Sequence, residues 1–288
     1  MLNYLEDKVN VLFDVIENRW ESKLFLSISG YTLVVSFVIL LILIELLLRG
    51  FLPHFLDKIV PSNHFYAINY VFTLLLIFEV ISLVFSLVHS VASSVGKQFE
   101  ILSLILLRNS FKEFIYFPEP IEWNKVTEPI FHILSDATGA LLIFIILGFY
   151  YKLQKHQLIT KNAIDQKRFV SAKKLLALIL ILVFIFLGVD YLWKTYNHIP
   201  VTNFFTSFYT VLIFSDILIV LISIRYCQNY YSVFRNSAFA LTTVFIRLAL
   251  SAPVYYNVAI AVFTGLYTLG VTYAYNVFYK EIEPTHKK

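Results

Sequence analysis

Eight apolar runs divide the chain, each close to the ~20 residues that a helix needs to cross a bilayer. Their bounds are roughly 24–48, 65–91, 98–117, 129–152, 172–195, 202–226, 235–252 and 254–279. With 59% hydrophobic residues, 15% charged residues and a mean hydropathy of +0.74, the chain carries more apolar surface than a soluble domain of 288 residues can bury. The sequence therefore predicts an all-α integral membrane protein with eight transmembrane helices.

Residues 1–23 precede the first run and are not typical of a signal peptide, because acidic side chains interrupt them. Apolar residues such as Val9, Phe13, Ile16 and Trp20 recur at helical spacing. This pattern predicts an amphipathic helix on the cytoplasmic side. Two placements stay open, one on the membrane surface and one packed on the cytoplasmic face of the protein itself.

Lysine and arginine residues in the loops provide a separate check on the number of crossings. If the N-terminus is cytoplasmic, eight crossings place sixteen loop Lys and Arg residues on the cytoplasmic side and five on the other. This asymmetry is what the positive-inside rule predicts. We therefore expect both chain ends, including the tail 280–288, in the cytoplasm. The linker 153–171 is basic and suits anionic lipid headgroups better than nucleic acid.

The linker separates two halves, 24–152 and 172–279, that repeat the same features. An acid lies in the second helix of each half, Glu79 and Asp216, and an arginine in the third, Arg108 and Arg247. The fourth helices share the dipeptides Thr138-Gly139 and Thr264-Gly265. Because each half has an even number of crossings, the two halves should enter the membrane in the same direction, as parallel repeats.

The second half also resembles a known family. The features that carry the resemblance are the stretch Phe214 to Leu250 with its acid, the aromatic-basic loop Tyr226 to Arg235, the run Phe245-Ile246-Arg247-Leu248, and Phe186-Leu187-Gly188 followed by Asp190. They are similar to the phosphate-starvation-inducible PsiE family of four-helix membrane proteins. The resemblance covers roughly 172–279, with a more diverged copy over 24–152. It implies a four-helix unit with internal charges in the bacterial inner membrane, and the family has no established activity. The chain departs from the family in being a fused pair and in carrying an insertion, Phe117 to Pro129.

Charged side chains inside a bilayer are costly unless they face protein or water. In each half the first helix also ends on an acid, Glu45 or Asp190. A guanidinium between two carboxylates can satisfy all three groups. We therefore predict two charge clusters, one in each half. The first comprises Glu45, Glu79 and Arg108, and the second comprises Asp190, Asp216 and Arg247.

A polar row extends from the first cluster, because Glu79, Ser82, Ser86 and His89 share one helix face. Such a row is suited to carrying water or protons, although serines also permit close helix packing and His89 suits an interfacial hydrogen bond. Asp136 either extends this network or faces water near a helix start. The comparable row of the second half retains few polar residues.

Two functions follow from these charges. The first is a pathway or transporter for protons or small ions. The alternative is a non-conducting structural or regulatory module in which the clusters are latches between helices. The sequence has no nucleotide-binding loop, nucleophile elbow or zinc-ligand spacing, and its single cysteine is Cys227. We therefore expect no enzyme activity, cofactor or metal, and a homo-oligomer stays an open alternative.

Overall fold

The structure, a computed structural model, describes residues 2–51, 63–88, 91–154, 163–197, 199–200, 204–226 and 230–282. Regular structure within these ranges is entirely helical, as predicted. The α-helices are α1 (Leu2–Trp20), α2 (Lys23–Leu48), α3 (Phe65–Ser86), α4 (Val91–Lys112), α5 (Thr127–Leu153), α6 (Ala163–Tyr196), α7 (Phe204–Tyr226), α8 (Tyr230–Ser251) and α9 (Tyr256–Ile282). All of these except α1 and α4 are long and apolar enough to cross a membrane, which indicates a multi-pass membrane protein.

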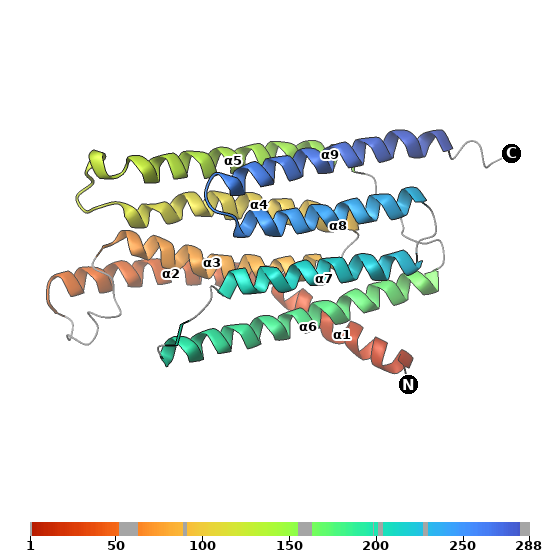
Figure 1. Cartoon of the computed structure of the whole chain (residues 1–288). Coiled ribbons are helices and arrows are strands. Elements are labelled where there is room, and N and C mark those ends of the chain that lie inside the picture. Colours follow the sequence, from red (N-terminus) through yellow and green to blue (C-terminus); the bar gives the residue numbers. More distant parts are fainter. Residues whose placement is uncertain are drawn as a thin grey trace.

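Helices α2 to α9 lie roughly side by side along one bundle (Figure 1). Consecutive helices pack together within α2–α5 and within α6–α9. The two groups meet where α4 packs against α8, α5 against α9 and α3 against α6. Helices α3, α5, α7 and α9 begin at the same end of the bundle, and the others run in the opposite direction (Figure 1).

The central helices α4 and α8 are the most polar of the bundle, and their position explains why. Each contacts neighbours within its own group and also contacts the other. Half of the apolar window of α8 is buried, compared with 6% of that of α2, which lies at the edge. Protein neighbours shield α4 and α8 from surrounding solvent or lipid, so these helices tolerate more polar side chains than α2 does.

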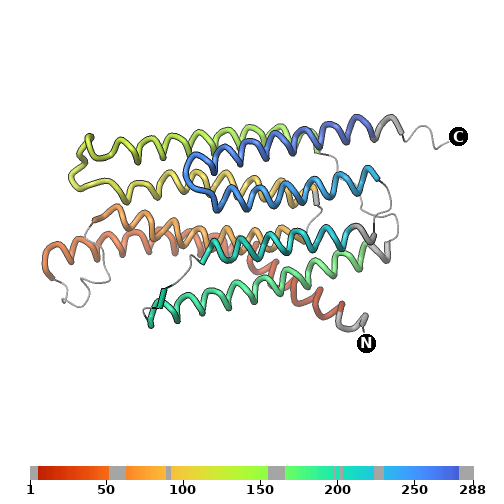
Figure 2. The backbone as a smooth tube through the Cα atoms, viewed as in Figure 1, coloured from red at the N-terminus to blue at the C-terminus, as the bar shows by residue number. Residues whose placement is uncertain are grey.

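Helix α1 crosses the bundle obliquely and packs on α6 and α2 (Figure 2). Phe13 is fully buried, Lys174 forms an ion pair with Asp14, and the Trp20 indole N–H donates to the Ser82 hydroxyl at 2.9 Å. The opposite face exposes Val11, Leu12 and Val15. One face of α1 is therefore packed on the protein, and the apolar residues of the other face are suited to the membrane surface.

Several helix boundaries differ from those expected. Helix α6 begins at Ala163, so part of the predicted linker 153–171 is helical. Helix α4 begins at Val91 and not near residue 98. Both additions carry polar residues and pack against protein, and the apolar runs therefore did not include them. A 3₁₀ turn, η1 (Glu113–Tyr116), follows α4, and the insertion Phe117 to Pro129 contains a second one, η2 (Trp123–Lys125), before its last residues enter α5.

Two glycines bring α5 and α9 into close contact. A Cβ atom on Gly139 would lie 2.7 Å from the Val258 side chain, and one on Gly265 would lie 2.9 Å from Ile146. Both distances are too short for a real Cβ contact. Small residues at these two positions therefore let the helix backbones approach, as in many membrane helix pairs.

Candidate functional site

Asp216 of α7 and Arg247 of α8 form an ion pair in the interior of the bundle. The Arg247 Nε lies 3.5 Å from the Asp216 Oδ2. Arg247 has no exposed surface and Asp216 is 4% exposed. Each side chain is thus desolvated, and each is the nearest opposite charge available to the other.

The hydrogen bonds of this pair are incomplete. The Nε, Nη1 and Nη2 atoms of Arg247 have no hydrogen-bond acceptor among the described residues, and the Asp216 Oδ2 has no donor. A guanidinium carries five N–H donors, and leaving buried donors unused costs free energy. The arrangement therefore differs from a fully satisfied structural latch, in which each donor would have an acceptor.

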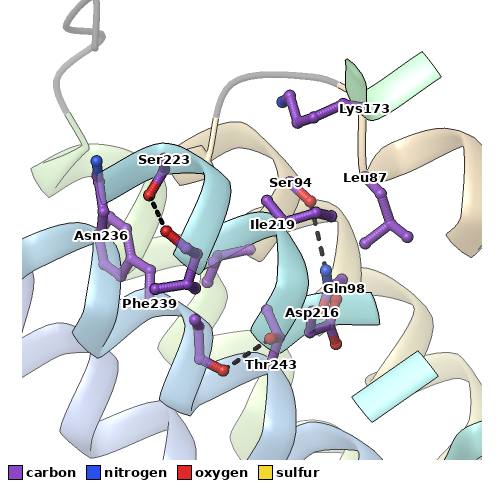
Figure 3. A pocket seen from close by; sticks show the side chains of 13 residues that line it. Leu87, Ser94, Gln98, Lys173, Asp216, Ile219, Ser223, Asn236, Phe239 and Thr243 are labelled. Atoms are coloured by element: carbon purple, nitrogen blue, oxygen red, sulfur yellow. Dashed lines mark hydrogen bonds between the residues drawn. The ribbon is translucent and has the colours of Figure 1, made fainter. Parts of the chain in front are cut away.

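A small cavity of about 40 Å³ lies beside Asp216 (Figure 3). Asp216 and Thr243 line one part of it, and Lys173 of α6 lies at the opposite end. Four further polar residues line the cavity, and they are Ser94, Gln98, Ser223 and Asn236. Since a water needs roughly 10–15 Å³ and several polar partners, the cavity has room for a few waters beside Asp216.

A much larger cavity, of about 1210 Å³, lies toward the bundle end where α3, α5, α7 and α9 begin. We call it the crevice. Residues of both helix groups line it, including Arg108, Asp136, Tyr209, Ser251 and Asn257. It therefore lies between the two groups and not within either one.

The ion pair separates the two cavities. On α8, Arg247 is one helical turn from Thr243, which lines the small cavity, and one turn from Ser251, which lines the crevice. Polar residues four or seven positions apart share a helix face, and they form a stripe on each of these two helices. The stripe on α7 is Tyr209, Asp216 and Ser223, and the stripe on α8 is Asn236, Thr243, Arg247 and Ser251. The two stripes together join residues that line the crevice to residues that line the small cavity, and we call them the polar route.

The corresponding pair of the first half is not in contact. Arg108 donates to the Phe72 carbonyl oxygen at 3.4 Å and to the Asn109 side chain at 3.0 Å. Glu79 is buried and acts on Arg108 only at longer range. Tyr209 lies within electrostatic range of both Arg108 and Arg247. The two arginines therefore act on a common region between the halves and do not form two separate sites.

Glu45 and Asp190 do not join the arginines, so the predicted three-member clusters are not formed. Glu45 pairs with Arg49 at 2.6 Å and with His64 at 3.4 Å, and its side chain is 45% exposed. Asp190 pairs with Lys194 at 2.6 Å, with 37% of its side chain exposed. Both acids have a basic residue four positions later on the same helix or at its end, and this nearby partner satisfies them.

Most of the predicted polar row does not reach a cavity. Ser82 accepts the hydrogen bond from Trp20, and Ser86 donates to the Leu83 carbonyl oxygen at 2.7 Å. Neither serine lines the small cavity or the crevice, and His89 lies outside the described residues. Asp136 does line the crevice. It is 1% exposed and accepts a hydrogen bond from Asn257 at 2.7 Å.

Sequence reasoning did not identify Tyr209, Thr243, Gln98 or Lys173 as site residues. Gln98, Lys173 and Thr243 come together around the small cavity only when α4, α6 and α8 pack, and Tyr209 of α7 lines the crevice. Within the described ranges, no group of three His, Cys, Asp or Glu side chains is arranged to hold a metal ion. Comparisons of the chain with protein-family models, with curated proteins and with solved structures found no match.

Proposed function

We propose that this protein moves protons or small ions across a bacterial inner membrane, along the polar route through Asp216 and Arg247. In this proposal the chain is a duplicated PsiE-like protein with eight crossings and both ends in the cytoplasm. Protons or ions enter the crevice, pass the ion pair and leave through the small cavity.

The packing pattern supports the duplication. Helices α2–α5 and α6–α9 pack in the same order and run in the same directions. Helix α4 is counted as a crossing because it packs beside α3, α5 and α8, and its 22 residues extend about 33 Å at a rise of about 1.5 Å per residue. That length matches the hydrocarbon thickness of a bilayer, which is about 30 Å.

The observation that carries the proposal is a buried ion pair with unused hydrogen-bonding groups between two cavities. A proton taken up by Asp216 removes the charge that attracts Arg247. The guanidinium is then free to turn toward the crevice, and loss of the proton to the small cavity restores the pair. This exchange needs no net change of protonation on arginine, which stays charged.

Reconstitution in liposomes tests this function. Purified protein should dissipate an imposed pH gradient, followed with an enclosed pH-sensitive dye. Asp216→Asn and Arg247→Gln should each reduce the flux at least tenfold. Asp190→Asn, which changes an exposed acid outside the route, should leave the flux unchanged. Wild-type protein that passes neither protons nor common small ions under any gradient would contradict the proposal.

The second candidate is a non-conducting structural or regulatory module in which the ion pair joins α7 to α8. The complete burial of Arg247 favours it, because a fully buried side chain offers no surface to a passing ion. In that case the same two substitutions should lower thermal stability without any flux to lose. Because a loss of stability is expected for both functions, the flux through the wild-type protein separates them.

A further inference from the structure

The acidic residues of the crevice already have partners. Asp136 accepts the hydrogen bond from Asn257. Glu113 contacts His132, with 3.0 Å between its Oε2 and the histidine Nδ1. Neither carboxylate therefore needs a ligand to satisfy it.

The basic residues of the crevice are not paired in this way. Among the described residues, Arg108 and Lys112 have no carboxylate within 4.0 Å, and the Arg108 Nε is buried without a hydrogen bond. Glu79 influences Arg108 only from farther away. Arg108 and Lys112 are four residues apart on α4, so they lie on the same face. The crevice thus offers unpaired positive charge on one wall.

Apolar side chains from α6, α7 and α8 also line the crevice. We call four of them the apolar wall: Phe184, Leu192, Phe205 and Leu250. The volume of about 1210 Å³ is above the roughly 300–1000 Å³ typical of sites for small organic molecules. A bare inorganic ion would leave most of this space and all of the apolar wall unused.

We infer that the crevice binds an amphipathic organic anion. The anionic group lies against the Arg108 guanidinium, which presents a planar fork suited to a carboxylate, and Lys112 adds a second positive charge. The hydrocarbon part of the ligand packs against Phe184, Leu192 and Phe205. A soluble carboxylic acid and a membrane fatty acid share this chemistry.

Three eight-carbon probes test the charge preference. Isothermal titration of the purified protein should show binding of octanoate, and much weaker binding of octanol and of octylammonium. Arg108→Gln should weaken octanoate binding at least tenfold and Lys112→Gln about threefold. Lys125→Gln is the matched control, because Lys125 is an exposed lysine paired with Glu122 outside the crevice, and it should bind as the wild type does.

A second variant tests the apolar wall without changing a charge. Gly188 lines the crevice, and a Cβ atom there would meet only Phe204, at 3.8 Å. Gly188→Leu should therefore fold normally and reduce octanoate binding by occupying the space. This variant keeps the inference testable if Arg108→Gln does not fold.

Oleate in nanodiscs of neutral lipid distinguishes the source of the ligand. Binding of octanoate in detergent supports a soluble acid, and binding of oleate alone supports a membrane fatty acid. The inference is wrong if neither acid binds, if octanol or octylammonium binds as tightly as octanoate, or if Arg108→Gln and Gly188→Leu both bind like the wild type. Ligand binding is measured without an ion gradient. A negative binding result therefore does not depend on whether the protein conducts protons or ions.

Discussion

Asp216 and Arg247 each depend on the other for charge compensation, because both are buried. Replacing either residue alone leaves an uncompensated charge in the protein interior. We expect Asp216→Asn or Arg247→Gln to lower the free energy of unfolding by about 3–5 kcal/mol. The double substitution should recover a large part of this loss. Denaturation in detergent followed by circular dichroism measures the three values.

Asp190→Asn is the control for the three Asp216 and Arg247 variants. Its ion pair with Lys194 is partly exposed and lies within one helix. Exposed pairs contribute about 0–1 kcal/mol, so this substitution should change stability little. If Asp190→Asn and Asp216→Asn lowered the free energy of unfolding equally, burial would not account for the contribution of the Asp216–Arg247 ion pair.

At the residue scale, charge inside an apolar run was a reliable guide to Asp216 and Arg247. The same guide failed for Glu45 and Asp190, because it ignored bases four residues away at Arg49 and Lys194. The sequence contains that spacing, so these two local pairs were predictable. The role of Thr243 as a site residue was not predictable. A threonine hydroxyl in a membrane helix commonly donates a hydrogen bond to a backbone carbonyl of its own helix, and the Thr243 hydroxyl donates to the Ala240 carbonyl oxygen.

At the scale of helices, the close contact of α5 with α9 should depend on two glycines. Gly139→Ala and Gly265→Ala should each destabilise the protein by about 1–3 kcal/mol, because the added methyl meets Val258 or Ile146. Gly148→Ala in α5 and Gly270→Ala in α9 are matched controls, since open space surrounds both positions. These controls should be neutral or stabilising, because alanine favours the helix. Thermal unfolding of the four variants measures the difference.

Docking of α1 should depend on pH through Glu17. Partial burial raises the pKa of the Glu17 carboxyl, nearby Glu21 and Asp14 raise it further, and Lys174 opposes them. The docked helix therefore holds this proton more tightly than a released helix does. Its docking is strongest below the ordinary pKa of 4.5 and weakens as pH rises through the raised value.

Hydrogen exchange of α1 measures this effect. Amide protection in α1 should increase as the pH is lowered from about 7 to about 5, after correction for intrinsic rates. Glu17→Gln should remove most of this increase and protect α1 at neutral pH. Asp7→Asn changes an exposed acid on the same helix and should retain the pH dependence of the wild type.

The existence of the helices was predictable because apolar runs of bilayer length have few other structures available. Their ends were less predictable. Ala163 to Ser171 of α6 are polar enough to resemble a linker, yet the segment is helical, and Ser171 accepts a hydrogen bond from Asn10 of α1. That contact joins residues far apart in the chain, and local sequence patterns do not report it.

At the scale of the whole molecule, the proposed eight crossings would place the two ends of α4 on opposite sides of the membrane. Cysteine labelling in intact cells tests this, starting from Cys227→Ser so that no native thiol remains. Lys125→Cys should react with a membrane-impermeant maleimide, and Lys97→Cys should react only after the membrane is permeabilised. Labelling of both positions from outside would contradict eight crossings.

The helices of the described residues could be predicted and their orientation in the membrane stays a prediction, but the way the two halves meet could not be predicted. Loop charges and helix count determine orientation. The contacts of α4 with α8 and α5 with α9 arise from shape, at positions such as Gly139 and Gly265. For this reason the sequence predicted one charged site in each half, whereas the crevice and the ion pair lie around a shared interface.

The polar character of α4 has a consequence for synthesis of the protein. Its sequence is too hydrophilic to qualify as a membrane segment by itself, although it packs centrally between α3, α5 and α8. A nascent chain that ends after α4 therefore lacks the partners that make this helix soluble in lipid. If α4 crosses the membrane, we expect its stable insertion to wait until α5 has left the ribosome, so that the two helices enter the bilayer as a hairpin.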